Sequence, residues 1–323
     1  MLEIQNLVKH FGPLVAVDGV SFTVPRGEVL GFLGPNGAGK STTMKMAAGF
    51  LAPTGGTAAI CGDDILTRPL AAKRHLGYLP EGAPAYPDMA VADFLGFIAA
   101  IRGLRGAQRK ARLDEIVEIM RIGEVLNQPI ETLSKGFQRR VGVAQALLHD
   151  PPVLILDEPT DGLDPNQKHE MRSIIRAMQP NKAIVISTHL LEEVEAVCSR
   201  AIIIARGRIL ADGAPAELAA RSRRHNAARL VVTAAAEARL RGELAHLPGV
   251  ASVEPEHDGD GTALIVYPRD HRPIAAEIAE YVRGQGVAVI EWRIEQGRLD
   301  DVFRTITAPE AAPPAPEPIR QAA

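Results

Sequence analysis

The sequence predicts an α/β fold built on a largely parallel sheet, followed by a second, smaller α+β domain. Through the first two thirds of the chain, short apolar runs rich in β-branched residues alternate with helical patterns. Alternation of this kind is typical of βα units on a parallel sheet. The length of 323 residues also suits two domains, each with a core of its own.

Three strand–helix pairs are expected in the first domain. The strands are expected at residues 29–33, 153–156 and 183–186, and the helices that follow them at 40–49, 167–178 and 190–197. Further helical patterns fall between the first and second pairs, at 91–102, 107–122 and 134–148. They predict a helical insertion in the α/β domain.

Beyond a basic cluster at 221–225, which predicts a linker, the pattern changes. Strands are expected at 230–233, 250–255, 262–267 and 287–292, with helices at 237–245 and 273–283. This β-α-β-β-α-β order is typical of a ferredoxin-like fold, with residues 258–261 as a hairpin turn. We therefore expect an α/β domain at 1–222, an accessory α+β domain at 226–307, and a disordered Pro- and Ala-rich tail at 308–323.

Charge and composition argue against several functions. The 36 basic and 39 acidic residues give a formal charge of −3, so no overall positive field attracts nucleic acid. No stretch approaches the roughly 20 apolar residues of a membrane span, and the N-terminus lacks the pattern of a signal peptide. Cys61 and Cys198 match no metal or disulfide spacing, and we expect both to be buried in a cytoplasmic protein.

A glycine-rich loop between the strand at 29–33 and the helix at 40–49 carries the strongest functional signal. It reads Gly34-Pro35-Asn36-Gly37-Ala38-Gly39-Lys40-Ser41-Thr42. Glycines let backbone N–H groups surround phosphate oxygens, and Lys40 places a positive charge on the β- and γ-phosphates. Ser41 can bind Mg²⁺, and Thr42 is expected to donate toward the α-phosphate. In this strand–helix context the loop predicts a P-loop for ATP and Mg²⁺; the alternative is a turn that binds nothing.

Two carboxylates follow the second of these strands. Residues 153–156 are continuously apolar, as in a strand buried on both faces, and they run into Asp157 and Glu158. A carboxylate without compensation at such a strand end is costly. Mg²⁺ held by Ser41 and, through water, by Asp157 would compensate one charge, while Glu158 would act as general base. The alternative makes Asp157 a loop residue and Glu158 a helix-start residue.

With these motifs, residues 1 to about 220 resemble an ATP-binding cassette (ABC) domain. Residues 133–137, Leu-Ser-Lys-Gly-Phe, resemble the family signature, and residues 161–164 resemble its D-loop. His189 resembles the switch histidine, and Phe11 the aromatic that stacks on adenine. The resemblance implies a P-loop NTPase cassette with a helical insertion that hydrolyses ATP.

The resemblance also implies a homodimer, in which ATP lies between the P-loop of one subunit and Ser134 and Gly136 of the other. It implies that His189 senses the γ-phosphate and that Asp164 lies at the dimer interface. Other interpretations stay open for these residues. Ser134 and Asp164 are good helix N-caps in any case, a lone His after a strand is usually structural, and Phe11 alone would favour a core position.

The chain departs from the family pattern at two motifs. Glu81 stands where most members have the Gln that contacts Mg²⁺ and couples to the membrane partner; a carboxylate can still be a Mg²⁺ ligand. Lys135 and Phe137 replace the usual Gly and Gln of the signature, while Ser134 and Gly136 remain. We expect ATP hydrolysis to survive both departures.

A single cassette followed by a small domain ending in Leu-Asp-Asp-Val-Phe at 299–303 resembles the ATP-binding subunits of ABC-2-type exporters. Pro80 and Glu81 resemble the gliding-motility and multidrug-export subgroup. The resemblance implies a cytoplasmic protein, peripheral on the inner face of the membrane, whose separately encoded permease docks near residues 83–91; a solvated loop there is the alternative. A soluble ABC ATPase and a mechanical motor of the cell envelope also stay open. The accessory domain is expected to regulate or to stabilise the dimer.

Overall fold

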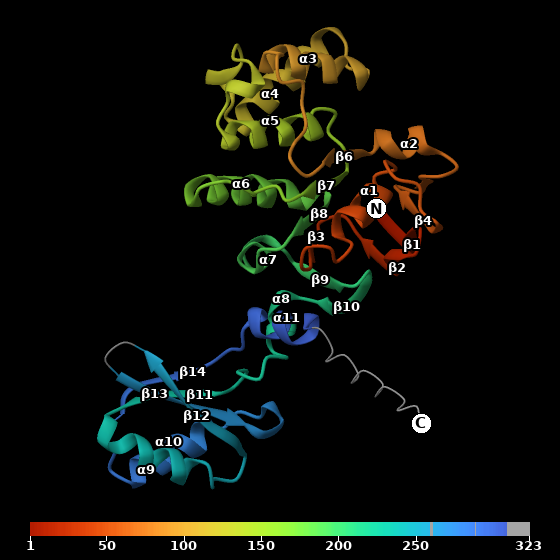
Figure 1. The fold of residues 1–323 in the computed structure, drawn as a ribbon. Coiled ribbons are helices and arrows are strands. Elements are labelled where there is room, and N and C mark those ends of the chain that lie inside the picture. The colour runs from red at the N-terminus through yellow and green to blue at the C-terminus, as the bar shows by residue number, and fades with distance from the viewer. Residues whose placement is uncertain (259–260, 288, 309–323) are drawn as a thin grey trace, which may run out of the picture. The chain divides into compact units, whose positions relative to one another are not determined.

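The computed structural model describes residues 1–258, 261–287 and 289–308, and the chain divides into two compact units, Met1–Leu218 and Ala219–Ala323 (Figure 1). The tail predicted at 308–323 lies outside the described residues apart from Ala308. The same holds for residues 259–260 of the predicted hairpin turn.

A six-stranded sheet of order β10-β9-β3-β8-β7-β6 forms the centre of the first unit. Its strands are β3 (Val29–Leu33), β6 (Leu76–Leu79), β7 (Val153–Asp157), β8 (Ala183–Thr188), β9 (Arg200–Ala205) and β10 (Arg208–Gly213). All neighbours pair in parallel except β9 and β10. Every residue of β3, β7 and β8 is buried, which explains why these strands are continuously apolar.

A second sheet of the same unit is antiparallel and was not predicted from the sequence. It has the order β2-β1-β4-β5, with β1 (Leu2–Phe11), β2 (Leu14–Val24), β4 (Gly55–Ile60) and β5 (Asp63–Asp64). One hydrophobic core joins residues of this sheet, such as Ile4 and Val20, with Phe32 of β3 and Met44 of α1 (Lys40–Ala47). Helix α1 is thereby fixed directly behind the loop that follows β3.

The remaining helices of the first unit cover the central sheet or form the insertion. They are α2 (Pro69–Arg74), α3 (Val91–Ile101), α4 (Gly106–Met120), α5 (Lys135–Leu147), α6 (Pro165–Met178) and α7 (Leu191–Val197), with short 3-10 helices at η1 (Gly123–Val125), η2 (Ile130–Thr132) and η3 (Gln179–Asn181). The short helix α8 (Pro215–Ala219) contains the boundary between the two units. Helices α3, α4 and α5 gather at one end of the unit, as the predicted helical insertion requires (Figure 1).

The second unit has a four-stranded antiparallel sheet of order β12-β13-β11-β14. Its elements are β11 (Ala228–Val232), α9 (Ala234–Leu244), β12 (Val250–Asp258), β13 (Gly261–Pro268), η4 (Arg269–His271), α10 (Ala275–Gly284), β14 (Val289–Ile294) and α11 (Leu299–Thr307). Helices α9 and α10 lie on one face of the sheet and share a core with its strands (Figure 1). The expected β-α-β-β-α-β order is present, and α11 is an additional helix that the sequence did not predict.

Two expectations from the sequence need correction. Cys198 is buried as expected, but Cys61 is exposed in a turn after β4, with a left-handed φ of 52°. The basic cluster expected as a linker belongs to the second unit, where Arg224 is ion-paired with Glu256 at 2.9 Å. Over the described parts of the chain, none of the helices is long and apolar enough to cross a membrane.

Candidate functional site

A cleft of about 400 Å³ opens at the glycine-rich loop between β3 and α1. Its lining residues are Phe11, Leu14, Ala16, Pro35, Asn36, Gly37, Ala38, Gly39, Lys40, Ser41, Thr42, Glu81 and Glu158. Gly39 has a φ of 105°, and a Cβ atom there would lie 2.5 Å from the carbonyl oxygen of Ala16. A Cβ atom on Gly34 would lie 2.4 Å from the carbonyl oxygen of Ile204. The loop can therefore take this path only with glycine at both positions.

Lys40 is buried at the start of α1 and turns its ammonium back onto the loop. Its Nζ donates to the carbonyl oxygens of Gly34 at 2.7 Å and Pro35 at 3.3 Å. Burial lowers the pKa of Lys40, and three nearby carboxylates oppose this shift, namely Glu158, Asp157 and Glu81. Helix α1 has no side-chain N-cap and no acidic residue in its first turn, so its N–H groups and the ammonium together favour an anion.

Asp157, at the end of β7, is a fully buried carboxylate without a hydrogen bond. Its exposed fraction is 0%, and neither carboxylate oxygen has a partner with hydrogen-bond geometry. Burial raises the pKa of Asp157, and the nearby hydroxyl groups of Ser187 and Ser41 only partly oppose this rise. An uncompensated buried carboxylate is costly, so these two oxygens fit a ligand cation.

The few side-chain oxygens near Asp157 suit Mg²⁺, which needs few protein ligands, better than a metal ion whose ligands all come from the protein. Among the described residues, no group of three or more His, Cys, Asp or Glu side chains forms a metal cage. Mg²⁺ commonly takes one or two protein ligands and completes its shell with phosphate oxygens and water. Asp157, the Ser41 hydroxyl and the exposed Glu81 carboxylate are the side chains near the P-loop that could hold it.

Glu158 and His189 contact each other across neighbouring strands. His189 Nδ1 lies 3.0 Å and 3.1 Å from the two carboxylate oxygens of Glu158, and it donates when it carries the ring proton. The Glu158 backbone has a φ of 51°, and its N–H donates to the Ser187 carbonyl oxygen at 2.8 Å. A left-handed conformation in a residue other than glycine costs roughly 1–3 kcal/mol and is common at functional sites. The alternative interpretations are therefore wrong: Asp157 is the last residue of β7, and Glu158 precedes a turn, since the next helix, α6, begins only at Pro165.

A third carboxylate, which was not predicted from the sequence, connects the segments that carry these two residues. Glu193 of α7 is buried and accepts hydrogen bonds from Thr160, two residues beyond Glu158, and from Thr188 at 3.2 Å, directly before His189. Burial raises the pKa of Glu193. The signal available in the sequence was an acidic residue beside Val194 and Val197 on the apolar face of an amphipathic helix.

Phe11 precedes the glycine-rich loop in the sequence and Glu81 follows it, and both line the cleft. Phe11 is 48% exposed and lies at the cleft wall, with the Lys9 ammonium 5.2 Å from its ring centre. The core position that Phe11 alone would favour is therefore wrong. Glu81 follows β6 and lines the same cleft.

Ser134, Gly136 and Asp164 form a separate cluster at the starts of α5 and α6. Ser134 is the N-cap of α5 and accepts the N–H of Phe137 at 3.4 Å, and Asp164 caps α6 in a capping box with Gln167. A Cβ atom on Gly136 would lie 2.5 Å from Gln167 Nε2. None of the three lines the P-loop cleft of its own chain. The structure thus brings together the P-loop, Asp157, Glu158 and His189, and leaves the signature residues apart.

The buried lysine at a glycine loop, the unpaired strand-end carboxylate and the adjacent glutamate define a P-loop nucleotide hydrolase. The model of the ABC transporter family matches residues 17–161 of the chain. Nod factor export ATP-binding protein I of Ralstonia nicotianae is 34% identical over 315 residues, which cover 96% of this chain and 94% of that protein. The chain belongs to the ABC transporter family, as an ATP-binding subunit with ATPase activity.

Other relatives and solved structures match the part of the chain that contains the cassette. Probable multidrug ABC transporter ATP-binding protein YbhF of Escherichia coli K12 is 37% identical over 223 residues, which cover 69% of this chain and 38% of that protein. A solved ATP-binding subunit of an ABC transporter, 31% identical, matches with a TM-score of 0.63 over 68% of this chain and 91% of its own. The dimeric cassette MJ0796, 23% identical, has the same fold with a TM-score of 0.61, over 67% of this chain and 99% of its own.

Proposed function

We propose that this chain is the ATP-hydrolysing subunit of an ABC-2-type exporter and powers a separately encoded permease from the cytoplasmic face of the membrane. Relatives named for Nod factor export align with nearly the whole chain, including the accessory unit, and a multidrug relative aligns with the cassette. The unpaired Asp157 beside the P-loop is the observation that carries the hydrolytic part of this proposal. The described helices provide no membrane span, and in this proposal the permease supplies it.

The side chains of the cleft have distinct roles in this proposal. Lys40 and the P-loop amides bind the phosphates, Thr42 donates toward the α-phosphate, and Phe11 stacks on the base. Ser41, Asp157 and Glu81 would hold Mg²⁺, which when bound neutralises phosphate charge. Glu158 takes a proton from the attacking water, and His189, at 3.0 Å, orients Glu158 and senses the γ-phosphate.

The proposed site is completed by a second copy of the chain. Ser134 and Gly136 lie at the N-terminus of α5, where backbone N–H groups can face a γ-phosphate, yet they are outside the P-loop cleft of their own chain. Asp164, at the start of the neighbouring α6, would lie at the same interface. Closure of the two copies on ATP and their reopening after hydrolysis would drive the permease.

An exposed aromatic cluster supports the position proposed for the permease. Tyr86 is exposed and packs edge-on against Phe97 at 5.7 Å and against Phe94 at 6.3 Å. Phe97 and Ile101 of α3 are also exposed. Neighbouring exposed apolar side chains favour an interaction surface over a solvated loop, and this surface adjoins residues 83–91.

The proposal is tested by capturing the tagged full-length chain from native membranes in detergent, identifying co-purifying proteins and measuring ATP turnover. We expect a polytopic membrane protein and ATP turnover that Lys40→Ala abolishes. Tyr86→Ser should reduce the permease yield while leaving the turnover of the isolated chain unchanged. Recovery of ribosomes would favour the soluble ABC ATPase, and recovery of a cell-envelope enzyme would favour the mechanical motor.

A further inference from the structure

Strand β14 leaves one long side of the second unit's sheet open. In the described part of the chain it is the outer strand of the order β12-β13-β11-β14 and pairs with β11. Ile290 and Ile294 are 68% and 48% exposed on it. An exposed edge with large apolar side chains is a template for pairing with another strand. Residues 289 to 294 contain no Pro or Lys, and the charged side chains on this edge are Glu291 and Arg293.

The residues of this edge are complementary to themselves. They read Ile290-Glu291-Trp292-Arg293-Ile294, with opposite charges on either side of Trp292 and isoleucines beyond them. If two copies pair antiparallel with Trp292 opposite Trp292, Glu291 faces Arg293 twice, and the exposed Ile290 and Ile294 flank these charged pairs. Opposite charges and apolar side chains stabilise antiparallel strands when they are directly opposed.

The backbone of β14 has the alternation that this register needs. Glu295 donates its N–H to the Ala227 carbonyl oxygen at 2.8 Å, so its backbone groups face β11. In an antiparallel pair, the residues whose backbone N–H and C=O groups face the neighbouring strand alternate along the chain. The backbone groups of Arg293 and Glu291 therefore face β11, and those of Ile294 and Trp292 face away from it, toward the open edge. The register is regular from Ala228–Ile294 to Val231–Glu291, and its one irregularity lies between Glu291 and Val289, at Ile290. The regular alternation therefore covers Glu291 to Ile294.

The charged side chains of the edge also remain available. The Glu291 carboxylate touches Arg229 at 3.4 Å and the Arg293 guanidinium touches Glu295 at 2.8 Å, yet the side chains are 53% and 52% exposed. Both stand on the sheet face away from α9 and α10, because Glu291 pairs with Val231 and Arg293 with Arg229 in the register.

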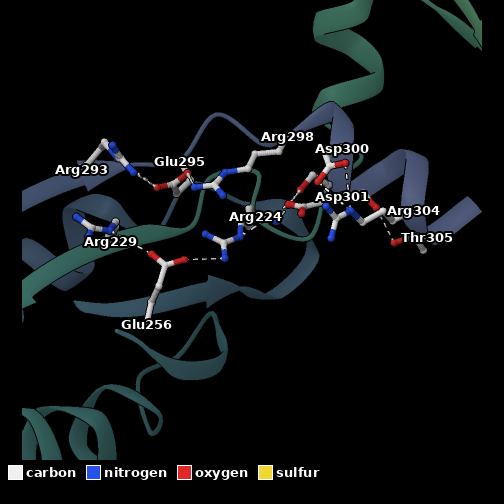
Figure 2. A network of polar contacts seen from close by, with 11 residues as sticks. Arg224, Arg229, Glu256, Arg293, Glu295, Arg298, Asp300, Asp301, Arg304 and Thr305 are labelled. Carbon is white, nitrogen blue, oxygen red and sulfur yellow. Dashed lines mark hydrogen bonds and ion pairs between the residues drawn. The ribbon is translucent and has the colours of Figure 1, made fainter. Parts of the chain in front are cut away.

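This face already carries alternating charges (Figure 2). Figure 2 shows Arg224 and Arg229 joined through Glu256, and Arg293 beside Glu295. The partner copy's Glu291 and Arg293 side chains would continue the alternation across the edge of the sheet. Charge complementarity therefore favours a second copy of this chain over an uncharged strand.

We propose that two copies of this chain pair through antiparallel β14 strands, with Trp292 at the two-fold axis, and that this contact forms without nucleotide. The proposal concerns a surface of the second unit and uses no residue of the nucleotide site. The β14 contact would hold two cassettes in one assembly while ATP binding and hydrolysis close and open them. A chain that lacks this contact would still hydrolyse ATP, so a failure of this proposal is distinguishable from a failure of the proposed function.

Charge exchange tests the register. The dimer dissociation constant of the full chain is measured by sedimentation equilibrium without nucleotide. Glu291→Arg and Arg293→Glu each place two like-charged pairs at the interface and should raise this constant about tenfold. The double variant restores the opposite charges and should recover most of the loss. An equimolar mixture of the two single variants should form a heterodimer about as tight as the wild-type dimer.

Control variants distinguish the loss of the interface from a loss of folding. Glu280→Arg makes the same charge change at an exposed position of α10 and should leave the dissociation constant unchanged. Ile290→Lys should weaken the dimer without any charge exchange to rescue it. Circular dichroism and ATP binding report folding of each variant. A wild-type chain that stays monomeric without nucleotide, or single variants that fail to complement each other in the mixture, would overturn the proposal.

Discussion

Two buried charged side chains, Asp157 in the first unit and Arg229 in the second, have opposite surroundings. Asp157 in the first unit is 0% exposed and neither of its oxygens has a hydrogen-bond partner. Arg229 in the second unit is 5% exposed and is paired with Glu256 at 3.3 Å and with Glu291 at 3.4 Å. A buried charge that the protein leaves uncompensated costs stability and points to an absent ligand, whereas a compensated one is structural. We therefore expect the bound cation at Asp157 and its neighbours.

The largest effect is expected from Glu158→Gln. The amide keeps the size of the side chain but cannot take a proton from water, so ATP turnover should fall roughly 10²–10⁴-fold while ATP binding persists. The measurements are steady-state phosphate release and equilibrium binding of ATP. A turnover that is unchanged would remove Glu158 from the role of general base.

Asp157→Asn should separate stability from activity. Without Mg²⁺ and nucleotide, we expect the free energy of unfolding to rise by about 1–2 kcal/mol, because an uncompensated buried charge is removed. Turnover with Mg²⁺ should fall sharply. Chemical denaturation followed by circular dichroism gives the first quantity, and a loss of stability would contradict the functional interpretation of the unpaired oxygens.

Glu256→Gln is the matched change in the second unit and should act in the opposite direction. It removes the charge that joins Arg224 and Arg229, so the second unit should lose about 1 kcal/mol of unfolding free energy, a value reduced by the partial exposure of Glu256. ATP turnover should be unchanged. The same denaturation and turnover assays apply, and increased stability would show that this network is not a stabilising one.

A smaller effect concerns the pH dependence of stability through Glu193. Its folded-state pKa is raised by burial, so its contribution to stability is fully present below the ordinary carboxyl pKa and is lost as the pH rises through the raised value. Glu193→Gln removes this titration. The unfolding free energy measured without nucleotide should therefore fall less steeply with rising pH in the variant than in the wild type. Identical slopes would mean that Glu193 is ionised at no cost in the folded chain.

Much of the site could be predicted from local sequence, because its elements are consecutive. The strand at 29–33 was predicted with the bounds that β3 has, and the P-loop and the Asp157-Glu158 pair follow their strands directly. Periodicity reports which face of a segment is buried, but not which distant segment covers it. The second sheet was missed for this reason, since Leu2 of β1 pairs with Ile60 of β4.

Contacts between residues far apart in the sequence could also not be predicted. Glu193 accepts hydrogen bonds from Thr160 and Thr188 only in the folded chain, and its local sequence does not indicate these partners. Cys61 was expected in the core because its type is usually buried, whereas a left-handed turn places it in solvent. The roles assigned to Ser134, Gly136 and Asp164 remain predictions, since a second copy of the chain is needed to bring them to a P-loop.

The most direct test of the contrast between the two buried charges is the change in melting temperature when Mg²⁺ is added to the ATP-saturated protein. A ligand that binds only the folded state raises its stability, and at a given concentration the rise is larger for tighter binding. We predict a clear rise for the wild type and for Glu256→Gln, and a much smaller one for Asp157→Asn. An equal rise in all three proteins would contradict the account, because the unpaired oxygens of Asp157 would then not be the place that the cation occupies.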